Sequence, residues 1–313
     1  MPPEIFDLTD QISLTPTQAV GIPLALVGAI LLSLGAQFQH RGVADMEAHH
    51  GEAANSGLKW GQVTSLLSRP AWVFGTVFLG LAIVFQLSSL AIAPIMVVQP
   101  LGAVALVMTA IMNSRIVKIK LDAISIRAII MCVAGVGAFV ALAAVFAKSS
   151  AITQRELSIV LIVLAIVLAL WVLLFIIFRQ HGSPVFYIIG AGMLFGFVAT
   201  LAKVVIDRIK TIVISGSGIE STDLLTVLCI IGLIAASLLG SYFVQTAYAT
   251  GPPDLVVAGL TVVDPLVAVT VGIIVLGEAS DAPLWAVVAF VVTGAVAIFG
   301  VFSLSKHHPQ LKS

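Results

Sequence analysis

One acidic residue stands in the middle of a long apolar segment near the carboxyl-terminal end of the chain. The run DLVVAGLTVVDPLVAVTVGIIVLGE extends from Asp254 to Glu278 and contains Asp264. A run of this length crosses a bilayer as a helix, and an ionisable group near the midplane costs about 2.5–3.5 kcal/mol on insertion scales. Such residues face a bundle interior or a wet cavity, so Asp264 is a candidate substrate, ion or metal ligand. The alternative is a carboxylate that hydrogen-bonds a neighbouring helix as a packing contact.

A polar residue followed by proline occurs twice in matching surroundings. The segment VVQPLGAV, which begins at Val97, matches VVDPLVAV, which begins at Val262. The match pairs Gln99–Pro100 with Asp264–Pro265. Because proline removes a backbone donor and leaves a carbonyl without its helical partner, we expect both prolines to break their helices beside a binding site lined by Gln99 and Asp264.

Two glutamines precede these segments at equal spacing. Gln86 stands eight residues before Pro94, and Gln245 stands eight residues before Pro253. Both fall inside apolar stretches, where a glutamine either lines a solute path or bonds a neighbouring helix for about 0.6 kcal/mol. The sequence leaves both interpretations open, and we count both residues as candidate binding residues.

A third pair of matching segments carries ionisable side chains. GAILLSLGAQFQHRGVAD, from Gly28, aligns without gaps with GAGMLFGFVATLAKVVID, from Gly190. The match pairs Arg41-x-x-x-Asp45 with Lys203-x-x-x-Asp207, and residues four apart share one helical face. Lys203 and Asp207 are candidate binding residues. The simpler interpretation is an interfacial ion pair in which the lysine snorkels to water, and we likewise expect Glu278 to be solvated at the end of its span.

The elements that carry these residues are apolar helices. Of the 313 residues, 60% are hydrophobic and 10% are charged, against about 25% charged in a soluble domain. The runs are continuously apolar, which is typical of helices and not of a barrel. The sequence therefore predicts an all-α polytopic membrane bundle of about nine transmembrane helices. The expected spans are Ala19–Gln39, Pro70–Ala91, Pro94–Ser114, Ile124–Ala147, Leu157–Phe178, Pro184–Val205, Leu224–Tyr248, Leu255–Leu276 and Leu284–Leu304.

The matching segments divide this single membrane domain into two halves of four and five helices. Residues 1–148 would hold the first half, with a cytoplasmic loop at 40–69, and residues 149–313 the second. The matches pair the first, second and third spans with the sixth, seventh and eighth. An offset of five spans is odd, so the two copies insert in opposite orientations. Inverted repeats of this kind are common in secondary transporters, whose substrate sites lie near the midplane between the halves.

The basic residues set the expected orientation. With the amino terminus outside, ten fall on the inner side and four on the outer side, which favours that topology under the positive-inside rule. The inner ones are Arg41, Lys59, Arg69, Arg115, Lys118, Lys120, Arg127, Arg179, Lys306 and Lys312, and the outer ones are Lys148, Arg155, Arg208 and Lys210. We expect a plasma or inner membrane protein with its carboxyl terminus in the cytoplasm.

Two segments resemble a known family. LAIAPIMVVQPLGAVALVMTAIMNS (Leu90–Ser114) and FRQHGSPVFYIIGAGMLFGFVATLAKVVIDRIK (Phe178–Lys210) are similar to the drug/metabolite transporter superfamily, and within it to the NIPA-type magnesium transporters. The resemblance implies a transporter, not an enzyme, with Mg²⁺ as one candidate substrate. One position departs from the family pattern, because Ile83 stands where magnesium-type members carry an acidic residue in the second helix.

The expected function is alternating-access transport of a small solute or cation, with Asp264 binding the cation or a coupling proton. The alternative is a non-transporting membrane subunit that holds a partner protein. The formal net charge is zero, which gives no indication of nucleic-acid binding. No cofactor motif is found; the coupling ion is left open between H⁺ and a divalent cation. The expected partners are the lipid bilayer and the substrate, and a homodimer stays open.

Overall fold

A computed structural model describes residues 16–50, 69–117, 122–148, 152–178, 183–215, 222–250 and 253–306, and within these ranges every regular element is a helix. Nine helical segments of this described part are long and apolar enough to cross a membrane, which confirms the fold class. The helices are α2 (Pro16–His50), α4 (Pro70–Ile92), α5 (Ile95–Val98), the 3₁₀ helix η1 (Gln99–Gly102), α6 (Ala103–Val117), α7 (Ala123–Phe146), α8 (Gln154–Phe178), α9 (Pro184–Ser215), α10 (Thr222–Thr250), α11 (Pro253–Ile274) and α12 (Leu284–Lys306).

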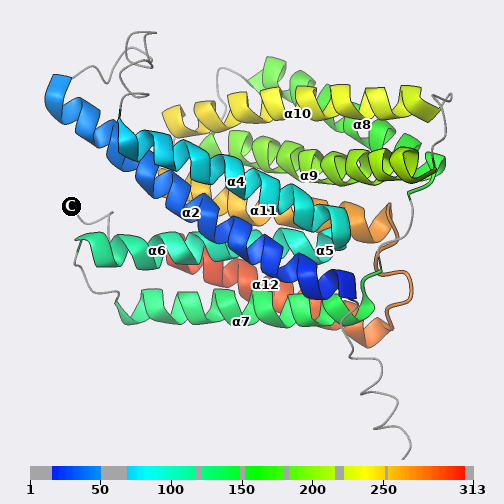
Figure 1. Ribbon diagram of the computed structural model, residues 1–313, viewed down its shortest axis with the longest axis horizontal. Coiled ribbons are helices and arrows are strands. Elements are labelled where there is room, and N and C mark those ends of the chain that lie inside the picture. Colours follow the sequence, from blue (N-terminus) through cyan, green and yellow to red (C-terminus); the bar gives the residue numbers. More distant parts are fainter. Residues whose placement is uncertain are drawn as a thin grey trace, which may run out of the picture.

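The helices pack in a pattern that repeats between the halves. Helix α2 packs along α4, and α9 packs along α10; α2 also contacts α6, as α9 contacts α11. Helices α7 and α12, the last of each half, pack against each other (Figure 1). Pro94 directly precedes α5 and Pro253 begins α11, so the two prolines occupy matching places. These contacts are those that the inverted repeat requires, and a superposition of the halves stays a prediction.

The outer surface of the bundle is apolar. Branched aliphatic side chains on α4, α8 and α12 are more than half exposed, among them Val84, Ile166 and Val291. Large exposed apolar surface is unusual in a soluble protein, but it is what a bilayer solvates. The core is built largely from small and medium side chains, with Ala143, Ala191, Ala236 and Ala268 fully enclosed, which lets the helix backbones approach closely.

Two boundaries differ from those expected. Helix α2 continues to His50, so the first eleven residues of the expected 40–69 loop are helical; the segment contains Ala44, Met46 and Glu47, which favour helix. Helix α9 continues ten residues past the expected end at Val205, to Ser215. The rest of that loop, residues 51–68, lies outside the described residues.

Candidate functional site

Three of the predicted binding residues line one cavity. Asp264 from α11, Gln99 from η1 and Gln86 from α4 border a space of about 380 Å³. The rest of the cavity wall is formed mostly by apolar side chains and by glycines. It consists of Gly28, Ala29, Leu32, Ala82, Ile83, Leu87, Gly102, Leu260, Thr261 and Pro265. Residues separated by up to 237 positions therefore meet where the two halves face each other.

Close packing of α9 against α11 sets the position of Asp264. A Cβ added to Gly192 would lie 2.6 Å from Cβ of Val263 and 3.3 Å from the Asp264 nitrogen, and one added to Gly196 would lie 2.9 Å from the Asp264 carbonyl oxygen. Only glycine fits at these two positions without a shift. A pattern of two glycines four residues apart allows a close helix approach, and the helix that Gly192 and Gly196 approach is the one that carries the carboxylate.

One carboxylate oxygen of Asp264 is enclosed and lacks a partner. Its Oδ1 atom is buried and receives no hydrogen bond from the described residues. A buried polar atom without a partner costs about 1–3 kcal/mol, and more when it is charged. A carboxylate that only joined two helices would be expected to use this oxygen in a hydrogen bond, so the partnerless Oδ1 favours the ligand role over the packing contact, and that role stays a prediction.

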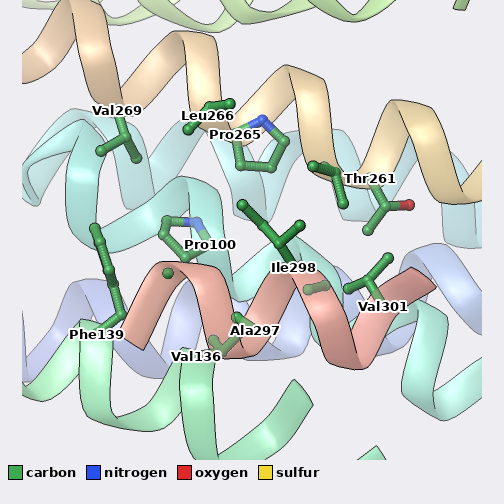
Figure 2. Close-up of a pocket in the computed structure, with 13 residues that line it drawn as sticks. Pro100, Val136, Phe139, Thr261, Pro265, Leu266, Val269, Ala297, Ile298 and Val301 are labelled. Carbon is green, nitrogen blue, oxygen red and sulfur yellow. The ribbon is translucent and has the colours of Figure 1, made fainter. Parts of the chain in front are cut away.

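The two prolines lie on facing helices but have different effects on them. Figure 2 shows Pro100 and Pro265 across a smaller apolar cavity of about 90 Å³, which Phe139 and Val301 also line. At Pro100 the helix tightens into the 3₁₀ turn η1 between α5 and α6, as expected of a break. At Pro265 helix α11 instead continues, because one missing N–H leaves the neighbouring turns intact. By the helical pattern the freed acceptor is the carbonyl of Thr261, a residue that borders both cavities.

The other predicted site residues lie elsewhere. Gln245 is exposed on α10 and does not line the cavity. Lys203 and Asp207 are on α9, with Lys203 Nζ 3.5 Å from Asp207 Oδ2. Lys203 is only 2% exposed, and its ammonium donates to the carbonyls of Leu90 and Ala93. The expected ion pair is present, but the lysine does not snorkel to water.

Glu278 contradicts the expectation of a solvated carboxylate. It is 2% exposed. Gly277 adopts φ 64°, a left-handed conformation that glycine accepts readily at a helix end. The chain reverses there, and Glu278 Oε1 and Oε2 accept from the backbone nitrogens of Ile95 and Met96 at 2.7 Å and 2.9 Å. A Gly-Glu pair just past an apolar span is a signal that sequence reasoning can register, but its partners lie more than 180 residues away.

Ile83 and Thr261 are two further cavity residues that sequence reasoning did not assign to the site. Ile83 stands at the position where the family pattern has an acidic residue, and it borders the cavity with 60% of its surface exposed. Thr261 lies three residues before Asp264, so helical spacing alone places both on neighbouring parts of one face.

Within the described residues, nine helical segments are long and apolar enough to cross a membrane, and three polar side chains predicted for the site border one cavity between them. The chain belongs to the NIPA family: the model of that family, described as magnesium transporter NIPA, matches residues 17–309. This confirms the resemblance found in the sequence. The chain is also similar to an uncharacterized protein of Corynebacterium glutamicum, with 24% identity over 288 residues that cover 92% of this chain and 95% of the relative. Comparison with solved structures gave no match.

Proposed function

We propose that the protein carries a small hydrated cation across the membrane by alternating access, with Asp264 as the charged binding residue. The observation that carries this proposal is the enclosed Asp264 Oδ1, which has no hydrogen-bond partner among the described residues and borders a cavity of about 380 Å³. A carboxylate at mid-depth is stabilised by a cation, by a proton or by a water that a cation polarises. The cavity supplies the space for any of these.

The polar groups of the cavity favour a cation that keeps its water. Mg²⁺ dehydrates reluctantly and is usually held by one or two carboxylates and several waters. Asp264 provides one carboxylate, and the amides of Gln86 and Gln99 can accept hydrogen bonds from metal-bound waters. Family membership makes Mg²⁺ the first substrate to test. Because Ile83 supplies no second carboxylate, a proton is the main competitor for Asp264.

We further propose that the amino terminus is outside and the carboxyl terminus cytoplasmic, in the plasma or inner membrane. This rests on the distribution of basic residues between the loops. Under this orientation the α4–α5 junction faces the outer side, and the cavity lies between it and the cytoplasmic end.

Transport by purified protein in liposomes tests the proposal. The Mg²⁺ gradient and the proton gradient are imposed separately, and the flux of each ion is followed with an enclosed dye. We expect Mg²⁺ flux that saturates with concentration and that Asp264→Asn abolishes. Asp281→Asn is the matched control, because this carboxylate is exposed and pairs with exposed Lys148. Mg²⁺ flux that is equal in liposomes with wild type, with Asp264→Asn and without protein would refute cation transport.

A further inference from the structure

The junction between α4 and α5 is held by two oppositely charged side chains from the other half of the chain. Lys203 Nζ on α9 lies 3.2 Å from the Leu90 carbonyl oxygen and 3.0 Å from that of Ala93. The Glu278 carboxylate after α11 accepts from the nitrogens of Ile95 and Met96. The two side chains therefore hydrogen-bond the backbone on both sides of the Ala93–Pro94 turn, where the first half reverses its direction (Figure 1).

The charges match the polarity of the backbone that they contact. The last carbonyls of a helix have no helical donors and carry partial negative charge, and its first N–H groups have no helical acceptors and carry partial positive charge. Lys203 meets the carbonyls that end α4, and Glu278 meets the N–H groups that open the next helical segment. Lys210 adds a bond to the Ala91 carbonyl. Bonds to ionised groups are about twice as strong as neutral ones.

The local backbone is shaped to admit this contact. A Cβ on Gly272 would lie 2.4 Å from Cγ2 of Ile95 and 3.1 Å from Oε2 of Glu278, so glycine lets α5 and the carboxylate meet over the end of α11. The Glu278 nitrogen donates to the Gly272 carbonyl at 3.0 Å, and the Lys148 nitrogen donates to the Glu278 carbonyl at 2.8 Å. These two backbone hydrogen bonds hold residue 278 in the position from which its carboxylate reaches Ile95 and Met96.

The Ala93–Pro94 turn lies directly beside the cavity that Asp264 lines. Ala93, Ile95 and Val98 are fully enclosed, and the next residue, Gln99, lines the cavity that contains Asp264. A solute that passes this end of the bundle must displace the turn from α9 and α11. Displacement breaks five side-chain-to-backbone bonds, including that of Lys210, but it also returns the two buried charges of Lys203 and Glu278 to water, which offsets part of the loss. Because rehydration of the two charges offsets part of the cost of breaking the bonds, the turn can both leave and rejoin α9 and α11 during transport.

We propose that Lys203 and Glu278 form a latch that closes the α4–α5 end of the transport path and holds Gln99 at the cavity. The proposal rests on the transport function inferred above, since a latch is needed only where a path opens. In it Lys203 and Glu278 are positioning residues: they act through the turn and do not touch the substrate.

The test measures how often this end opens. Val98→Cys is introduced as a reporter, because this side chain is fully enclosed between the latch and the cavity, and its reaction with a water-soluble maleimide is followed in detergent. Cys132 and Cys229 are fully buried and give the background rate. Glu278→Gln and Lys203→Met should each speed labelling of the reporter by about tenfold or more, as expected for loss of a bond to a charged group. Lys203→Arg keeps the cation and should restore slow labelling.

Asp281→Asn is the control, since it removes an exposed ion pair with Lys148 at the same end of the bundle, and it should leave the labelling rate unchanged. Labelling that stays slow in folded Glu278→Gln and Lys203→Met proteins overturns the latch. A decrease in labelling would overturn it as well. Because labelling requires no substrate, the latch can fail while ion transport is found, and the reverse result is equally visible.

A second measurement covers the case in which the latch variants do not fold. Ile95→Cys with Gly272→Cys places two thiols in contact across the closed end, and the latch residues stay intact. Oxidation should stop transport and reduction should restore it. Transport at the same rate in the oxidised protein, with the disulfide verified by mass spectrometry, would show that the turn never leaves α11 and would rule out the latch.

Discussion

Replacement of Asp264 by asparagine separates binding from folding more cleanly than any other single change in the chain. The substitution keeps the shape of the side chain and removes its charge. Since Oδ1 has no donor among the described residues, the change breaks no bond to that atom within the described protein. A bond to a charged group contributes about 1.5–3 kcal/mol, and 1.4 kcal/mol is a factor of ten in affinity. One lost contact to a cation should therefore weaken binding by about 10- to 150-fold.

In the protein without bound ion, the same substitution should not lower the thermal stability. A neutral amide enters an apolar environment more cheaply than a carboxylate, so the melting temperature of Asp264→Asn without ligand should equal or exceed that of the wild type. The stabilisation that Mg²⁺ gives to the wild type by mass action should be strongly reduced. Melting curves over a range of Mg²⁺ concentrations measure both quantities on one sample.

Two glutamines provide a matched comparison for this experiment. Gln86 lines the cavity, and its sequence counterpart Gln245 is exposed on α10. Gln86→Leu should weaken Mg²⁺ binding, and Gln245→Leu should not. The reasoning about Asp264 would be refuted if the asparagine variant bound and transported as the wild type does under every ion gradient. The binding residue would then have to be sought among the other polar side chains of the cavity wall, first Gln86 and Gln99.

Two further predictions concern selectivity and topology. Ile83→Glu adds a second carboxylate to the cavity wall and should raise the affinity for Mg²⁺ relative to monovalent cations, measured by calorimetry; unchanged selectivity would show that Ile83 does not face the ion. A cysteine at Thr9 should react with an impermeant reagent outside the cell and one at Ser313 should not, and the reverse pattern would invert the topology.

The sequence was sufficient to predict the helical elements and to associate Gln99 with Asp264. Continuous apolar runs made the spans visible, because a bilayer leaves helices almost no alternative. The Val-Val-x-Pro-Leu match predicted that Gln99 and Asp264 belong to one site, and both line one cavity. A repeat in sequence carries this information because each half must bury the same face against the other.

The sequence did not predict the latch or the different effects of the two prolines on their helices. Glu278 was expected in water because its span ends there, but the left-handed Gly277 returns the carboxylate into the bundle. Local sequence does not report a contact between positions 95 and 278. The two prolines also had different outcomes from the same motif, with a 3₁₀ turn at Pro100 and a continuous helix at Pro265. Packing against neighbouring helices decides whether a proline interrupts its helix, and the short repeated motif does not specify that packing.

The two halves divide the chemistry unequally, and the division bears on how the protein moves. The charged groups Lys203, Glu278 and Asp264 all belong to the second half. The first half meets the latch with backbone groups alone and lines the cavity with neutral Gln86 and Gln99. Continued without gaps, the Val-Val-x-Pro-Leu match pairs Glu278 with Asn113, so the repeat does not supply a second carboxylate at the opposite end. An inverted repeat makes the two ends of a transporter similar in shape, but here their charges differ. Closure at the α4–α5 end can therefore depend on the charge of Glu278, whereas the residue that the match places at the corresponding position of the first half is the neutral Asn113.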